Sequence, residues 1–64
     1  MMITRGAKLI RLDNNDVAIQ VAAIRRGPVP YAEIEPRGGG RRRAILLQEL
    51  ERDYRLEPGL ARDM

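Results

Sequence analysis

Apolar side chains alternate with other residues in the first two thirds of this sequence, and their spacing changes to that of a helix near residue 44. Alternation with a period of two is typical of a half-buried β-strand, whereas apolar residues three to four positions apart are typical of an amphipathic helix. The pattern therefore predicts a mainly β protein with one C-terminal helix.

Turn residues divide the first part of the chain into short segments that we interpret as antiparallel strands. Residues 1–4 are short and apolar, and in residues 8–12, KLIRL, Ile10 and Leu12 alternate with Arg11. Residues 16–24, DVAIQVAAI, have the clearest alternation. Asn14 and Asn15 are expected to form a tight turn before this third segment, because asparagine tolerates positive φ angles.

One face of the alternating segment is expected to form the core. Its members are Val17, Ile19, Val21 and Ala23. Residues 29–35 form a weaker candidate strand, because Pro30 lacks an amide hydrogen and is expected only at a sheet edge or a bulge. With a further short strand after it, the chain is predicted to have about five strands.

A helix is predicted over residues 44–56, because the apolar spacing changes to a helical one from Ala44 onward. Its apolar stripe contains Leu46, Leu47, Leu50 and Tyr54. Pro58 and Gly59 are expected to end the helix. We therefore expect a single domain over residues 1–57 and a frayed tail over residues 58–64.

The composition excludes several kinds of site. The chain has 64 residues and contains neither cysteine nor histidine, so it lacks disulfide bonds, the usual zinc ligands and histidine-based nucleophile pairs. We therefore expect no metal, no cofactor and no enzymatic activity. A chain this short also buries only about 60% of the surface that its unfolded form exposes, which favours association with a second copy.

No apolar run approaches the length of a membrane span, and the N-terminal segment MMITRGAKLIRL is too short and too interrupted for a signal peptide. The expected location is the cytoplasm, without membrane contact.

Positive charge is concentrated in the first two thirds of the chain. Residues 1–43 carry nine basic and four acidic side chains, whereas residues 44–64 carry three basic and five acidic ones. Nearly all of the basic residues are arginine, whose planar fork matches phosphate groups and base edges. This composition indicates nucleic-acid binding, although a GC-rich genome also raises the arginine content.

Three glycines, Gly38–Gly40, are followed directly by Arg41, Arg42 and Arg43 at the expected helix start. Arginines at a helix N-terminus are unfavourable, and no capping side chain precedes this helix. An anion bound at this point would explain the arrangement. Alternatively, the arginines form a solvated edge strand that resists aggregation.

Several short motifs agree with one known family. MMITR supplies an apolar strand that ends in Thr-Arg, residues 8–24 supply a strand, a turn and a strongly alternating strand, and Arg43 precedes a helix with Leu46 three residues on. This order of elements resembles the carbon storage regulator (CsrA/RsmA) family of bacterial post-transcriptional regulators. The chain departs from that family at Gly38–Gly40, which replace branched residues.

The resemblance implies an interlocked homodimer, in which the first strand of one subunit lies beside the fifth strand of the other. It also implies two RNA sites, which bind GGA in the hairpin loops of mRNA leaders or in small regulatory RNAs. The implied RNA-binding residues are Ile3, Thr4 and Arg5 on one side of the site, and Arg41, Arg42, Arg43 and Leu46 on the other.

Two alternatives to an RNA-binding regulator stay open. The chain is also compatible with a phage or mobile-element module that binds a host protein and mimics or antagonises a host regulator. A third possibility is a small DNA-binding antitoxin or repressor, although a single helix cannot form a helix-turn-helix.

Overall fold

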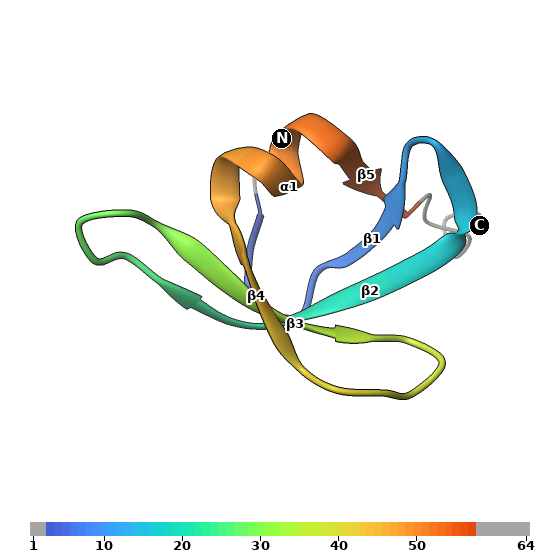
Figure 1. Ribbon diagram of the computed structural model, residues 1–64, viewed down its shortest axis with the longest axis horizontal. Coiled ribbons are helices and arrows are strands. Elements are labelled where there is room, and N and C mark those ends of the chain that lie inside the picture. Colours follow the sequence, from blue (N-terminus) through green and yellow to red (C-terminus); the bar gives the residue numbers. More distant parts are fainter. Residues whose placement is uncertain (1–2, 58–64) are drawn as a thin grey trace, which may run out of the picture.

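The computed structural model describes residues 3–57, which form one antiparallel sheet and one short helix (Figure 1). The elements are β1 (Lys8–Arg11), β2 (Asn14–Arg25), β3 (Tyr31–Pro36), β4 (Arg43–Leu46), α1 (Leu47–Asp53) and β5 (Tyr54–Leu56). The predicted fold class is thereby confirmed: the described part of the chain is mainly β, with five antiparallel strands and a single helix.

The strands are arranged in the order β4-β3-β2-β1-β5, so β4 and β5 form the two edges of the sheet. The sheet is strongly curved, and α1 lies over its concave side, where it connects the two edge strands (Figure 1). β1 pairs with β5 of the same chain, from Leu9 opposite Leu56 to Arg11 opposite Tyr54. A single chain thus joins the first and last strands of the sheet.

The turn between β1 and β2 lies two positions earlier than predicted. Arg11 pairs with Asn14, so Leu12 and Asp13 form the turn, and Asn14 already belongs to β2. The Asn14 side chain accepts a hydrogen bond from the amide of Asp16 at 3.0 Å. No non-glycine residue in the described range has a positive φ, so the prediction of left-handed asparagines was wrong.

The side chains of β2 switch between the two faces of the sheet part-way along the strand. Ile19 and Val21 are buried as predicted, but the register shifts between Val21 and Ala23. Beyond this bulge Ala23 pairs with Glu33, and Ile24 pairs with the buried Ala32. Because an extra residue reverses the alternation, Ile24 packs against the core in place of Ala23.

β3 is an interior strand, not the edge strand that the prolines suggested. The strand begins at Tyr31, directly after Pro30, so Pro30 removes no ladder hydrogen bond from it. The carbonyl of Pro30 accepts a hydrogen bond from the amide of Leu47 at 3.1 Å. The proline therefore borders the strand without interrupting it.

The predicted helix over residues 44–56 is shorter in the structure and is not the last element. Residues 44–46 belong to β4, and residues 54–56 form β5, which pairs with β1. Pairing with β3 and with β1 overrides local helical spacing, because tertiary context outweighs the weak helical preference of a short segment. Leu46 precedes α1 with an extended backbone and without a side-chain cap.

The core lies between the concave face of the sheet and α1. Its buried residues are Ile3, Leu9, Ile19, Val21, Ala32, Ile34, Ile45, Leu50 and Tyr54. Ile3 and Thr4 lie outside any strand, so the predicted first strand is absent from its described part; Met1 and Met2 lie outside the described residues. The expected tail over residues 58–64 also lies outside them.

The glycines between β3 and β4 differ in whether their backbone conformation and surroundings require glycine. Gly39 and Gly40 have φ angles of 99° and 134°, whereas Gly38 has no positive φ and has open space around its Cα. A Cβ on Gly40 would lie 3.3 Å from Cγ of Pro36. The hairpin loop therefore depends on glycine at its end and tolerates a side chain at its start.

Gly40→Ala is expected to destabilise the domain by about 1–3 kcal/mol, because an alanine at this φ is strained and also crowds Pro36. Gly38→Ala is the matched control; it is expected to leave stability unchanged or to raise it by about 0.4–1 kcal/mol, since it removes freedom from the unfolded chain. Urea unfolding followed by circular dichroism measures both. Equal effects of the two substitutions would contradict this assignment.

Candidate nucleic-acid interface

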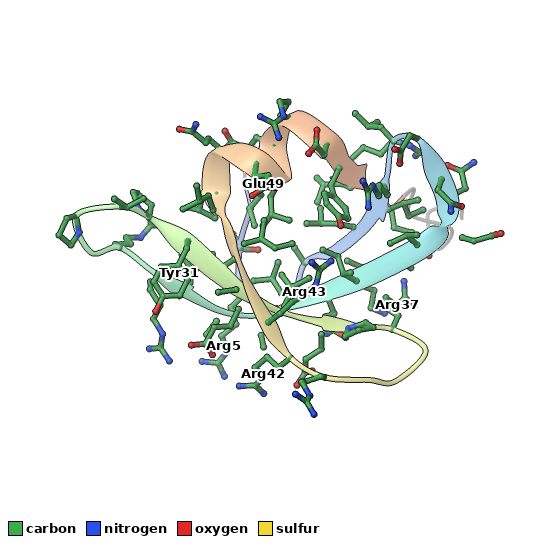
Figure 2. All side chains as sticks on the ribbon, in the orientation of Figure 1. Arg5, Tyr31, Arg37, Arg42, Arg43 and Glu49 are labelled. Atoms are coloured by element: carbon green, nitrogen blue, oxygen red, sulfur yellow. The ribbon has the colours of Figure 1, made fainter. Side chains whose placement is uncertain are left out.

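The hairpin of β3 and β4 places its arginines on opposite faces of the sheet. Arg43 pairs with Ile34, whose side chain is fully buried, so Arg43 shares the concave side with the core. Arg42 precedes it and contacts Glu35 and Glu33, which alternate with the buried residues of β3 and therefore lie on the convex side. Figure 2 shows Arg42 and Arg5 projecting from the same side of the sheet.

Arg42 is held tightly by two carboxylates. Its Nε and Nη2 donate to Oε2 of Glu35 at 3.2 Å and 2.8 Å, and its Nη1 lies 3.5 Å from Oε1 of Glu33. The hydrogen bond to Glu35 and the attraction of its charge raise the pKa of Arg42 above its usual value. Arg42 is therefore charged at any physiological pH, and its charge is already compensated within the sheet.

Other arginines have carboxylate partners as well. Arg25 Nε lies 3.5 Å from Glu33 Oε2, so Glu33 bridges two arginines across β2, β3 and the start of β4. The remaining ion pairs are Arg11 with Asp13, Arg37 with Glu57, and Arg52 with Asp53. The hydrogen bond from Arg52 lowers the pKa of Asp53 below its usual value. Most of the acidic side chains of the sheet are therefore already in ion pairs.

A second set of basic side chains lacks such partners. Within residues 3–57, no carboxylate forms an ion pair with Arg5, Lys8, Arg26, Arg41, Arg43 or Arg55. All but Arg55 precede α1 in the chain, where Asp16 is the one described acid that is also unpaired. The strands before α1 and their connecting loops therefore carry uncompensated positive charge, and α1 carries the unpaired Glu49 and Glu51.

Arg43 lines a small polar hollow of about 180 Å³ between β4 and α1. The hollow also contains Arg11 from β1 and the carboxylates of Glu49 and Asp53. In Figure 2, Arg43 and Glu49 lie on the α1 side of the sheet, away from Arg42. Arg43 is thus placed beside acceptor groups as well as a second arginine, an environment that suits a ligand with both donors and acceptors.

The structure separates the sequence-predicted residues into three environments. Ile3 is 8% exposed and belongs to the core, while Thr4 is exposed and its carbonyl accepts a hydrogen bond from the amide of Ala7. Arg5, Arg41 and Arg42 are exposed, with Arg5 and Arg42 on the convex side. Arg43 lies on the concave side. Leu46 is 41% exposed and pairs with Tyr31 on the convex side.

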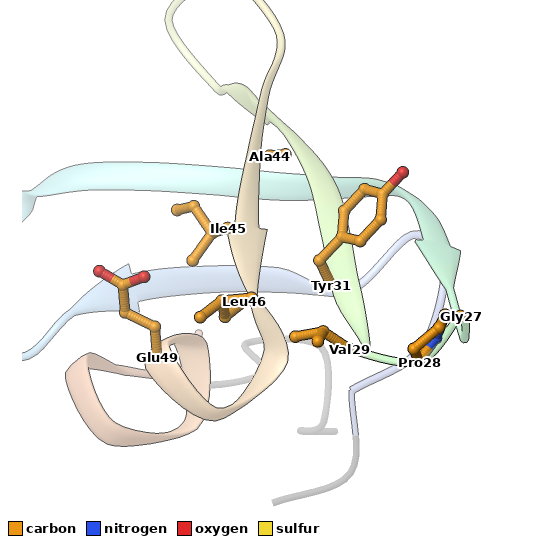
Figure 3. Close-up of a pocket in the computed structure, with 8 residues that line it drawn as sticks. All are labelled: Gly27, Pro28, Val29, Tyr31, Ala44, Ile45, Leu46 and Glu49. Atoms are coloured by element: carbon orange, nitrogen blue, oxygen red, sulfur yellow. The ribbon is translucent and has the colours of Figure 1, made fainter.

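A shallow apolar hollow of about 590 Å³ was not anticipated from the sequence (Figure 3). It is lined by Gly27, Pro28, Val29, Tyr31, Ala44, Ile45, Leu46 and Glu49. Val29 is 60% exposed, so two large apolar side chains, Val29 and Leu46, face solvent together here. The proline-rich segment before β3 is the signal that could have indicated this surface, because it holds Val29 outside the sheet.

The described residues contain no group of three or more potential metal ligands. Within the same part of the chain, no helix has the length and apolar character required to cross a bilayer.

These features define a small, curved β-sheet protein with an arginine-bearing convex face and a polar hollow beneath its helix. In comparisons with known proteins, no family model, no curated protein and no solved structure matches this chain.

Proposed function

We propose that this protein is an RNA-binding post-transcriptional regulator of the cytoplasm, which acts as a homodimer on GGA-containing hairpin loops of mRNA leaders. The observation that carries the proposal is the uneven pairing of charge. Arg5, Arg41 and Arg43 have no carboxylate partner in the described chain, although Glu33, Glu35, Asp13 and Asp53 neutralise other arginines nearby.

The arginines have different roles in this proposal. Arg5 and Arg41 are exposed and unpaired, so they contact phosphates, which give affinity without sequence preference. The guanidinium of Arg42 is paired with Glu35 and Glu33, so Arg42 links β3 to the start of β4 and does not contact RNA. No catalytic step belongs to this function.

Arg43 is assigned to base recognition. It is the arginine that the family resemblance singles out, and it lines a hollow that also offers the carboxylate of Glu49. An arginine fork can pair with the acceptors O6 and N7 of guanine, and a carboxylate accepts from base amino groups. A loop base that is turned out of its stack can reach such groups, as is common in RNA recognition.

The test compares two hairpins that differ only in the loop, one with GGA and one with the triplet scrambled. The wild-type protein is expected to bind the GGA hairpin about tenfold more tightly or better, since one bidentate base contact contributes about 1–3 kcal/mol of discrimination. Arg43→Ala is expected to remove this difference while the fold is retained. Fluorescence anisotropy over a salt titration measures both affinities.

Equal affinity of the wild-type protein for the two hairpins at every salt concentration would reduce the interaction to nonspecific electrostatic attraction and overturn the proposal. A retained preference in Arg43→Ala would move base recognition to another residue.

A further inference from the structure

Among residues 3–57, no strand pairs with the outer edge of β4. β4 pairs with β3 on one side, and it is the terminal strand of the sheet. The amide of Leu47 bonds to the carbonyl of Pro30, and antiparallel pairing alternates, so Ile45 and Arg43 also direct their backbone groups toward β3. Ala44 and Leu46 therefore direct theirs outward. This edge offers the amide and carbonyl of Ala44, the amide of Leu46 and the carbonyl of Arg42.

Apolar surface flanks these free groups. The shallow hollow of Figure 3 includes Ala44 and Leu46, and it reaches Val29 on one side of β4 and Glu49 on the other. A second hollow of about 230 Å³ continues from Val29 and Leu46 toward Leu47. An exposed edge with apolar surface beside it is a template for pairing with another strand.

The charge on the two ends of β4 is complementary. Arg41, Arg42 and Arg43 lie at the start of the strand, and the unpaired Glu49 and Glu51 lie just past its end, in α1. An antiparallel copy of the same strand reverses this order, so the arginines of each chain approach the acidic α1 of the other. Arg42 is bound to Glu35 and Glu33, so it does not cover the edge.

We infer that a second copy of this chain binds here, by antiparallel pairing of the two β4 strands about a two-fold axis at Ala44. This register uses the free groups named above: the two Ala44 residues exchange both backbone bonds, and each Leu46 amide donates to the Arg42 carbonyl of the other chain. The Leu46 carbonyl is not needed, because it accepts the first hydrogen bond of α1.

The β4 pairing defines the surface through which the two chains of the homodimer contact each other. It rests on the proposed function only for the existence of a dimer. It differs from the interlocked arrangement, in which the strand before the helix, here β4, lies beside the first strand of the partner chain: the second copy of β4 takes that edge instead. Pairing through β4 joins the two convex faces into one continuous surface, with Arg5 and Arg42 of both chains on the same side. RNA binding is a separate property that is measured separately.

Single cysteines provide the test, because the natural chain has none. Ala44→Cys is expected to form a disulfide-linked dimer under mild oxidation, since directly opposed residues of a bonded antiparallel pair have Cα atoms about 5.5 Å apart, within disulfide range. Leu46→Cys is the matched control on the same strand and face; it lies opposite Arg42 of the other chain and is expected not to crosslink. Nonreducing electrophoresis reads out both.

Ala44→Pro provides a second, independent test of the β4 contact. Its ring removes an amide hydrogen that β3 does not use, so the monomer is expected to keep its circular dichroism spectrum and to sediment as a monomer, whereas the wild-type protein sediments as a dimer. A monomeric wild-type protein, equal crosslinking of Ala44→Cys and Leu46→Cys, or a folded Ala44→Pro dimer would each overturn the inference. Loss of the GGA preference with the dimer intact would overturn the proposed function alone.

Discussion

Leu50→Ala is expected to leave most of the protein unfolded at room temperature. Leu50 is the buried residue of α1, and its side chain is fully shielded from solvent within the core. Removal of a buried leucine side chain costs about 2–5 kcal/mol, because apolar contacts are lost and a cavity remains. The core of a domain this small supplies only about 3–5 kcal/mol in total. Thermal and urea unfolding followed by circular dichroism measure the loss.

Leu56→Ala is the control for this substitution. Leu56 lies in β5 only a few residues away, but its side chain is 46% exposed, so the same change removes little buried surface. We expect an effect below about 1 kcal/mol, as for most surface substitutions. If Leu50→Ala unfolds at the same urea concentration as Leu56→Ala, α1 does not hold the two edge strands over the core as described.

The importance of Leu50 was predictable from the sequence, because it lies in the centre of the apolar stripe. The same stripe predicted Leu46 as a core residue, but Leu46 belongs to β4 and is partly exposed. Helical spacing persists by chance across residues 44–56, where strand, helix and strand follow one another. Local periodicity cannot separate them, because β5 exists only through its pairing with β1, more than forty residues earlier in the chain.

The sequence predicted which side chains of the strands face the core, up to the point where the backbone becomes irregular. The alternation in residues 16–24 correctly assigned Ile19 and Val21 to the core. The bulge beyond Val21 then moved Ile24 to the core side in place of Ala23. A bulge adds one residue to one strand only, so its position depends on the partner strand and not on the alternation itself.

The candidate site shows the same division between local and long-range information. The sequence identifies which residues are basic. Glu33 and Glu35 are two residues apart, so the period of a strand places both carboxylates on one face of β3. The pairing of Arg42 with Glu35 follows from the register of the hairpin, which depends on the length and conformation of the glycine loop. The sequence therefore predicted that the three arginines lie together on one side of a single site, whereas the structure gives each of them a different environment.

The difference between these environments leads to a second prediction with a large effect. Arg5→Gln combined with Arg41→Gln is expected to weaken binding of both hairpins about 25-fold at 0.1 M salt, because each phosphate contact to single-stranded RNA contributes a salt slope of about 0.7. The slope of log affinity against log salt concentration should become shallower by about 1.4. The ratio of affinities for the GGA and scrambled hairpins should stay unchanged, since phosphate contacts do not read sequence.

Arg52→Gln combined with Arg55→Gln controls for the loss of overall charge. Both residues lie in α1 and β5, outside the β2-β3-β4 part of the sheet, and Arg52 is already paired with Asp53. The control removes the same number of positive charges, so a purely global attraction would lose as much affinity in the control as in the test variant. A loss that is confined to the Arg5 and Arg41 variant locates the phosphate contacts at the unpaired arginines, whereas equal losses would show that the arrangement of ion pairs on the sheet does not select the RNA-binding face.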